Sequence, residues 1–142
     1  IKIPLYGNGL QIRDWLYVSD HCDALRLILS DGVIGNIYNI GGLNEKTNVD
    51  VISTICNKMD EELASHGDTS SINLITHVKD RAGHDKRYSI DISKVSDNLD
   101  WRPKETFESG IDKTIQWYLD NKDWWQPLLD RDGVGNRLGL KI

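Results

Sequence analysis

The sequence has few cysteines, no long apolar run and no excess of positive charge, and each absence excludes a class of protein. Only Cys22 and Cys56 occur among the 142 residues, both in apolar helix-like stretches where buried free thiols are usual, which favours a cytoplasmic, reducing compartment. No apolar run approaches the roughly 20 residues of a bilayer span, so we expect no membrane partner. A net charge of -5 argues against a nucleic-acid partner.

The first residue, Ile1, is not a methionine, and no basic stretch there leads into an apolar one. Nothing therefore resembles a signal peptide, and we expect a cut inside a longer protein. Hydrophobic residues make up 39% of the chain and charged residues 27%, which is typical of a globular protein. The length predicts a single unit over residues 1–142.

A glycine-rich dinucleotide loop is also missing. Such a loop has the form G-x-G-x-x-G and directly follows the first strand of its fold. Gly7-Asn8-Gly9 is the nearest candidate, but we expect it to precede a strand rather than follow one, with no helix starting at its end. We therefore predict no cofactor-binding residue in this chain.

What is present is an alternation of strand-like and helix-like segments. Strands are predicted at 11–18, 36–40 and 72–78. Helices are predicted from a cap at Ser19 or Asp20 to Asp31, from Thr47 or Asn48 to Leu63, after a cap at Asp91, and over 107–118. This order predicts an α/β fold with too few strands for a complete doubly wound sheet.

Helical stripes and tryptophans supply the predicted core. One stripe is formed by Val51, Ile52, Ile55, Cys56, Met59 and Leu63, and another by Phe107, Ile111, Ile115 and Tyr118. The tryptophans at 101, 117, 124 and 125 are interpreted as core and tail packing. These residues are predicted to have no role in binding.

The stretch KDRAGHDKRY, residues 79–88, is unusually rich in hydrogen-bond donors. Its first nine residues carry a formal charge of +2, from four positive and two negative side chains, in a chain of net charge -5. One interpretation is a solvated surface loop, and the other is a local anion site on an acidic protein.

Three stretches, in order, resemble the C-terminal half of the extended short-chain dehydrogenase/reductase family: PLYGNGLQIRDWLYVSDHCDAL, YNIGGLNEKTN and KDRAGHDKRY. NEKTN together with DRAGHDKRY resembles the dTDP-sugar dehydratases of that family in particular. Ala82 departs from the proline usual in this motif, which loosens the loop without removing a donor. The resemblance implies the C-terminal part of a Rossmann-like fold: the substrate-binding subdomain plus the last parallel strands and helices, without the N-terminal NAD-binding part.

The resemblance also implies a set of residues that bind dTDP-glucose or a similar nucleotide sugar: Pro4, Leu5, Tyr6, Arg13, Asn48, Arg81, His84 and Tyr88. Arg13 and Arg81 match positions that hold the pyrophosphate, which suits the planar, permanently charged guanidinium. His84 matches a nearby donor. The segment Pro4-Leu5-Tyr6 matches the part that lies along the thymine, and Asn48 matches a nucleotide contact at a helix start.

Each assignment has an alternative. Arg13 can form an exposed ion pair with Asp14, and Asn48 can be only a helix cap. Tyr6 can be a packed loop aromatic. A metal at His84 is not predicted, because no second histidine or cysteine stands at ligand spacing.

For the parent enzyme, the resemblance implies an NAD-dependent dehydration of dTDP-glucose to a 4-keto-6-deoxy sugar nucleotide, and a homodimer formed through the missing half. The family's catalytic Y-x-x-x-K pair is not expected here: Tyr118 to Lys122 fits the pattern, but its place near the C-terminus indicates chance. We therefore expect no catalytic residue and no turnover by the fragment alone. Two alternatives remain open, a related nucleotide-sugar epimerase or decarboxylase and a non-catalytic nucleotide-sugar binding module.

Overall fold

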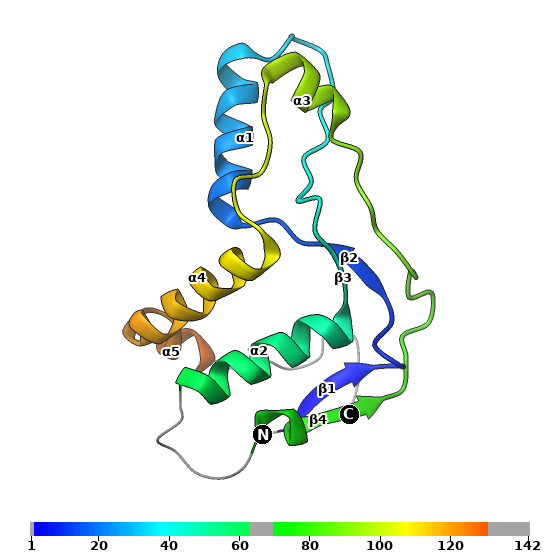
Figure 1. Ribbon diagram of the computed structural model, residues 1–142, viewed down its shortest axis with the longest axis vertical. Coiled ribbons are helices and arrows are strands. Elements are labelled where there is room, and N and C mark those ends of the chain that lie inside the picture. The colour runs from blue at the N-terminus through cyan, green and yellow to red at the C-terminus, as the bar shows by residue number, and fades with distance from the viewer. Residues whose placement is uncertain (1, 63–69, 131–142) are drawn as a thin grey trace.

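The computed structural model describes residues 2–62 and 70–130, which form two lobes (Figure 1). The helical lobe contains α1 (Val18–Asp31), the segment 33–40 and α3 (Ser93–Leu99). The sheet lobe contains β1 (Ile3–Tyr6), β2 (Ile12–Asp14), β3 (Glu45–Thr47), α2 (Asn48–Glu62), the 3₁₀ turn η1 (Ser71–Leu74), β4 (Ile75–Val78), α4 (Phe107–Asp120) and α5 (Lys122–Leu129).

The strands form two short pairs in the sheet lobe. β1 pairs in parallel with β4, from Ile3 opposite Ile75 to Tyr6 opposite Val78, and β2 pairs antiparallel with β3. The predicted α/β class is confirmed. One argument about the glycines was wrong, because residues 7–9 directly follow strand β1. The chain then continues into β2 rather than into a helix, so the turn still differs from a dinucleotide loop.

The strand predictions hold only in part. The strand predicted at 11–18 is confined to β2, because the α1 helix begins at Val18. The strand predicted at 36–40 is wrong: an extended segment needs a neighbouring strand to pair with, and no described strand pairs with it. The strand predicted at 72–78 begins as the 3₁₀ turn and becomes extended only at Ile75. Strand β3 was missed, because three polar residues show no alternation.

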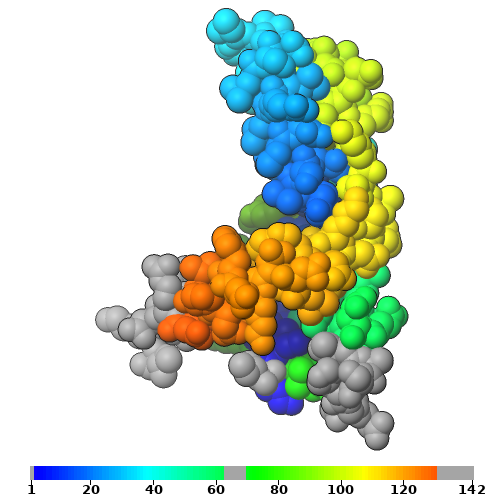
Figure 2. Space-filling model, turned by 90° about the vertical axis from the view of Figure 1, so that its left-hand side faces the viewer, coloured from blue at the N-terminus to red at the C-terminus, as the bar shows by residue number. Residues whose placement is uncertain are grey.

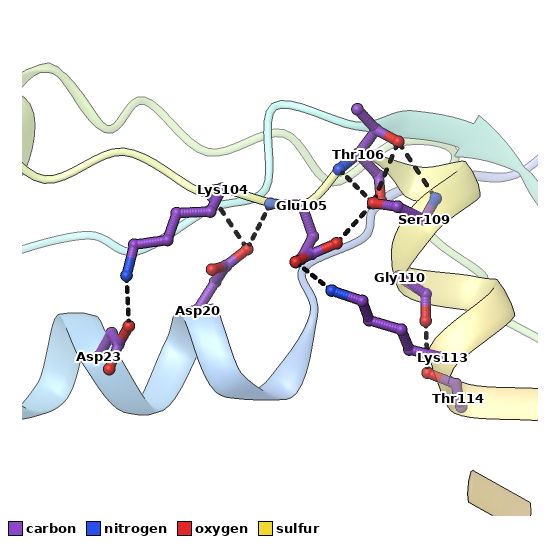
Figure 3. Close-up of polar contacts among 9 residues, drawn as sticks. All are labelled: Asp20, Asp23, Lys104, Glu105, Thr106, Ser109, Gly110, Lys113 and Thr114. Carbon is purple, nitrogen blue, oxygen red and sulfur yellow. Dashed lines mark hydrogen bonds and ion pairs between the residues drawn. The ribbon is translucent and has the colours of Figure 1, made fainter. Parts of the chain in front are cut away.

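Helix α1 begins at Val18, and its N-cap Tyr17 precedes the predicted caps Ser19 and Asp20 by two and three residues. Tyr17 occupies the N-cap position and makes no side-chain capping bond. The Asp20 carboxylate, whose residue is only 3% exposed, instead accepts from the backbone N–H groups of Lys104 (3.1 Å) and Glu105 (2.9 Å), as Figure 3 shows. Asp20 was predicted to cap α1, but its carboxylate instead connects α1 to the segment before α4.

The start of α4 is stabilised by a reciprocal cap. Ser109 N–H bonds to Thr106 Oγ1 (3.2 Å), and Thr106 N–H bonds to Ser109 Oγ (3.0 Å; Figure 3). The predicted helical stripe is confirmed at Phe107 and Ile115, which are buried, whereas Tyr118 is 51% exposed. The buried face of α4 thus extends from Phe107 to Ile115 and does not include Tyr118.

The helix after Asp91 and the Trp-rich tail also differ from the prediction. α3 begins at Ser93, whose N–H bonds to Asp91 Oδ1 at 2.8 Å, and it ends before Asp100, which has a left-handed backbone (φ 51°). The Trp-rich tail forms helix α5, which was not predicted. Because Asn121 separates α4 from α5, Tyr118 and Lys122 lie on different helices, which agrees with a chance Y-x-x-x-K pattern.

Each lobe has its own small core. In the helical lobe, Ala24, Ile92, Val95 and Trp101 form one buried cluster. In the sheet lobe, the buried apolar residues are Leu5, Val51, Cys56, Phe107 and Ile115. Of the predicted tryptophans, Trp101 is buried as expected. Trp117 and Trp124 are 42% and 63% exposed and pack on each other, with ring centroids 5.3 Å apart.

The outer side of the helical lobe is apolar and exposed. Leu29 is 88% exposed, Ile34 101% and Ile37 80%.

The two cysteines differ in exposure. Cys22 on α1 is exposed, so the prediction of a buried thiol is wrong there, while Cys56 is buried as predicted. Leu63 of the predicted α2 stripe lies outside the described residues. No helix in the described ranges combines the length and apolarity needed to cross a membrane.

An apolar cavity of about 480 Å³ lies where α4 approaches the connection between β2 and α1. Figure 2 shows the notch between the upright α1 and the α4–α5 region. The cavity is lined by Trp15, Tyr17, Phe107 and Trp117, among others. None of the eight predicted substrate-binding residues lines it.

Candidate anion-binding site

The residues 79–90, here called the anion loop, are attached to strand β2 through the backbone. Ile12 N–H donates to Lys86 O (2.9 Å), and Tyr88 N–H donates to Ile12 O (3.0 Å). Ile12 and Arg87 thus form a parallel bridge at the edge of β2 opposite β3. Two segments far apart in sequence, the start of the chain and the donor-rich motif, are therefore held side by side.

Arg13 points from β2 to the anion loop. Its Nη2 donates to Asp85 O at 3.0 Å, its Nη1 donates to Ile12 O at 2.6 Å, and its Cζ lies 4.3 Å from the centre of the Tyr88 ring. Asp14 does not neutralise it: that carboxylate accepts from the backbone N–H groups of Gly42 (2.7 Å) and Asn44 (2.8 Å). The alternative of an Arg13–Asp14 ion pair therefore fails, because the acid holds a different turn.

Arg81 belongs to a chain of hydrogen bonds at the other end of the loop. Its Nη2 lies 2.7 Å from His84 Nε2, and His84 Nδ1 lies 2.7 Å from Asp80 Oδ1. The His84 side chain is only 4% exposed. The bond from His84 is the largest cause that keeps the pKa of Asp80 below its usual value. His84 therefore stands behind Arg81, a position from which it supports the guanidinium.

Tyr88 bonds within the anion loop and its ring lies beside Arg13. Its hydroxyl donates to Asp85 Oδ2, and this bond, followed by the negative charge of Asp85, raises the pKa of Tyr88. The positive charges of Arg13 and Arg81 both act in the opposite direction on the same hydroxyl. Arg13 bonds to Asp85 and Arg81 bonds to His84, which are consecutive residues, so the two segments meet within the anion loop.

The segment at the end of β1 contributes one ring to this site. The Cζ of Arg81 lies 5.3 Å from the centre of the Tyr6 ring, within the range of a cation–π contact. Leu5 is 4% exposed, and its side chain packs where Gly9 and Val49 approach. Its side chain is therefore part of the core, while Pro4 is exposed.

Asn48 is the first residue of helix α2, and Thr47 is its cap. Thr47 Oγ1 accepts from Asp50 N–H at 3.1 Å, and the Asn48 backbone N–H donates to Gln11 O at 3.0 Å. The alternative that Asn48 serves only as a cap is wrong, because Thr47 performs that role. The Asn48 side chain is half-buried and is not needed for the helix start.

A clamp that the sequence did not reveal fixes the far end of the anion loop. Arg87 donates to both carboxylate oxygens of Glu45, at 2.7 Å and 2.6 Å, and Ser89 Oγ donates to Glu45 at 2.6 Å. The Arg87 bond, then the Ser89 bond, lower the pKa of Glu45 to about 2. Arg87, one of the four positive side chains counted in the loop, therefore has a structural role.

The described residues do not fit a dinucleotide cofactor. Gly7 and Gly9 have positive φ values of 59° and 73°, but the space beside them is filled. A Cβ on Gly7 would lie 2.7 Å from Asp80 Oδ2, and one on Gly9 would lie 2.8 Å from Leu5 Cδ2. The glycines allow close packing, and the carboxylate beside Gly7 would repel a phosphate.

Comparison with solved structures defines the class of protein first. The chain has the fold of the C-terminal part of an extended short-chain dehydrogenase/reductase. A dTDP-glucose 4,6-dehydratase from Bacillus anthracis, solved with NAD, is 46% identical, with a TM-score of 0.75 over 89% of this chain and 37% of that one. The corresponding enzyme from Streptomyces venezuelae, also solved with NAD, is 37% identical, with a TM-score of 0.76 over the same shares of the two chains.

Sequence comparison narrows the class to a family. The model of the GDP-mannose 4,6 dehydratase family matches residues 2–114, so the chain belongs to that family. A dTDP-glucose 4,6-dehydratase from Escherichia coli is 55% identical over 140 residues, which are 97% of this chain and 39% of the relative. The chain thus spans about two fifths of the length of the relatives it matches, and the predicted resemblance is confirmed.

Proposed function

We propose that this chain is the substrate-binding portion of a dTDP-glucose 4,6-dehydratase and that it grips the diphosphate of a dTDP-sugar. The observation that carries the proposal is that Arg13 and Arg81 hydrogen-bond to consecutive residues of the anion loop, Asp85 and His84. A nucleoside diphosphate sugar carries about two negative charges on its linkage, and planar guanidinium groups pair with such oxygens by two hydrogen bonds each.

The eight proposed substrate-binding residues divide by chemistry. Arg13 and Arg81 are the diphosphate ligands, and the Tyr88 ring lies beside Arg13. His84 was expected to be a donor to the ligand, but its Nε2 faces Arg81 and its side chain is 4% exposed, so we assign it a supporting place. Asn48, at the start of α2, is proposed to contact the nucleotide.

The thymine is proposed to lie along the end of β1. Tyr6 is half-buried beside Arg81 and Pro4 is exposed, so both present surface to a ligand. The side chain of Leu5 is in the core, which leaves only its backbone for such a contact. An aromatic face beside backbone groups suits a flat base with hydrogen-bonding edges.

For the whole enzyme we propose the dehydration of dTDP-glucose to a 4-keto-6-deoxy sugar nucleotide, with NAD as the internal hydride carrier. The names of the relatives support this reaction. The described residues supply no cradle for NAD, so we propose that the fragment binds substrate without turning it over. We further propose a cytoplasmic enzyme, since Cys22 and Cys56 are both free, and a homodimer assembled through the remainder of the chain.

Calorimetric titration of the chain with dTDP tests the proposal. Arg81→Lys keeps the charge but loses the paired fork, and should weaken binding by about 1.5–3 kcal/mol. Arg26→Lys on α1, with a side chain 83% exposed, is the matched control and should leave the affinity unchanged. If Arg81→Lys and the unaltered chain bind dTDP with equal affinity, the anion loop is only a solvated surface loop and the proposal is wrong.

Two further measurements separate the alternatives. Preference for dTDP over UDP supports the dehydratase, while preference for UDP would favour a related epimerase or decarboxylase. NAD-dependent turnover by the purified chain, with full-length enzyme excluded as a contaminant, would contradict the proposed division of labour between binding and chemistry.

A further inference from the structure

We propose that Asp80 is a positioning residue of the anion site: one of its carboxylate oxygens, Oδ1, decides which nitrogen of His84 carries the proton, and His84 in turn holds Arg81. The inference deepens the proposed function, because it rests on Arg81 being a diphosphate ligand. Asp80 itself is not placed against the ligand, so it acts only through these two neighbours.

The two oxygens of Asp80 have separate partners. Oδ1 accepts from the Arg81 backbone N–H at 2.8 Å and lies 2.7 Å from His84 Nδ1. Oδ2 accepts from Gln11 Nε2 at 2.9 Å and lies against Gly7. The carboxylate thus connects the anion loop with the turn after β1, although only His84 and Arg81 lead toward the ligand.

The chemistry of Arg81 determines the protonation of the ring. A guanidinium only donates hydrogen bonds, so His84 Nε2, 2.7 Å from Arg81 Nη2, must be the acceptor. The proton of neutral His84 therefore lies on Nδ1, from which it is donated to Asp80 Oδ1. A neutral imidazole free in water prefers the opposite form, with the proton on Nε2. In that form two donors would face each other, and Arg81 would be displaced.

Gln11 makes it possible to separate the hydrogen bond that Asp80 accepts from His84 from the negative charge of the Asp80 carboxylate. Gln11 is 7% exposed, and its buried Oε1 has no hydrogen-bond partner among the described residues. In Asp80→Asn, the oxygen of the new amide must stay at the Oδ1 position, where two donors point. Its NH₂ group then faces Gln11, whose amide can turn so that the unpartnered Oε1 accepts. The variant keeps the acceptor for His84 and loses only the charge.

The test measures the His84 tautomer by ¹⁵N NMR at a pH where the ring is neutral, and dTDP affinity by calorimetry, in the 142-residue chain. We expect the proton on Nδ1 in the unaltered chain and in Asp80→Asn, with dTDP bound equally well or more tightly in the variant because a negative charge is gone. Asp80→Ala should move the proton to Nε2 and weaken dTDP binding about tenfold, the effect of losing one charged hydrogen bond. Asp97→Ala, an exposed acid on α3, is the control for loss of charge and should change neither quantity.

Three outcomes would overturn the inference. A proton on Nε2 in the unaltered chain would do so whether or not any variant folds. A proton that stays on Nδ1 in Asp80→Ala would remove the proposed cause. Equal dTDP affinities of Asp80→Asn and Asp80→Ala would show that only the charge matters. If the unaltered chain binds no dTDP, the proposed function fails, and the tautomer alone then decides the inference.

Discussion

The helical lobe and the anion loop differ in what each needs from the rest of the protein. The helical lobe leaves large apolar side chains in water, such as Leu29 and Ile34, although its inner cluster is buried. In the anion loop the polar groups find partners close by: Arg87 with Glu45, Tyr88 with Asp85, and His84 with Asp80. Hydrogen bonds are satisfied by one neighbour in the right direction, whereas an apolar face needs a whole surface to cover it.

The chain spans about two fifths of its relatives, and the face of α1 with the segment 33–40 has no cover among the described residues. Large apolar side chains exposed in this way favour self-association. The polar groups of the anion loop, by contrast, are organised by contacts within the described residues. The two regions should therefore respond differently to mutation.

The largest effect is expected in the core of the helical lobe. Trp101 is 5% exposed, and Trp101→Ala should lower the free energy of unfolding by about 3–5 kcal/mol in urea denaturation. Trp124→Ala is the matched control: Trp124 is 63% exposed and should cost about 1 kcal/mol through its contact with Trp117. Equal losses would show that the helical lobe has no ordered core of its own.

A smaller loss is expected from Gly7→Ala. Gly7 has φ 59°, where an L-residue costs about 1–2 kcal/mol, and the new Cβ would lie 2.7 Å from Asp80 Oδ2. Gly35→Ala, in the helical lobe, also has a positive φ but meets nothing within 4 Å. The excess loss of Gly7→Ala over Gly35→Ala, measured by urea denaturation, is the part due to Asp80. No excess would mean that the turn and the anion loop are not coupled.

A pH-dependent effect is expected from the clamp on the anion loop. Folding lowers the pKa of Glu45 from 4.5 to about 2, so its stabilisation is complete above about pH 4.5 and is lost as the pH falls toward 2. Glu45→Gln should therefore be less stable than the unaltered chain at pH 6, with the gap closing below pH 4.5. Urea midpoints at several pH values check this. The exposed Glu62→Gln is the control, and a gap for Glu45→Gln that does not change with pH would contradict the prediction.

The smallest effect on stability is expected at the exposed apolar face. Leu29→Lys replaces a side chain that is 88% exposed, and should change the free energy of unfolding by less than about 0.5 kcal/mol. The same change should reduce self-association in sedimentation velocity, because it places a charge in the apolar surface. Strong destabilisation would show that Leu29 is packed within the chain after all.

Sequence reasoning predicted the regular parts better than the connections. The helical stripes located α2 and α4, because Val51, Cys56, Phe107 and Ile115 recur with the period of a helix. The cap predicted at Asp20 and the strand predicted at 36–40 failed for a common reason: what a carboxylate or a strand edge pairs with depends on a segment distant in sequence. Helix α5 was missed because two tryptophans and an internal proline gave no helical signal.

The resemblance predicted Arg13 and Arg81 as ligands, and the geometry shows which residues hold their side chains. Arg13 and Arg81 lie in short sequence motifs, so each could be matched to the family from its neighbours in the sequence. Glu45 and Gln11 have no motif, since Glu45 acts through Arg87 and Gln11 through Asp80, both far away along the chain. Asp80 lies within the KDRAGHDKRY motif, but from the sequence it was considered only as one of the negative charges in that stretch.

By itself the sequence determined the family, the helices and the donor-rich character of residues 79–88, because each of these is written in local spacing and composition. Only the tertiary structure decided that Arg13 meets the anion loop, that Asp80 directs its hydrogen bond to His84, and that Leu5 turns inward. These outcomes depend on pairing between segments that are distant in the chain, and such pairing is set by the direction and reach of individual groups in space.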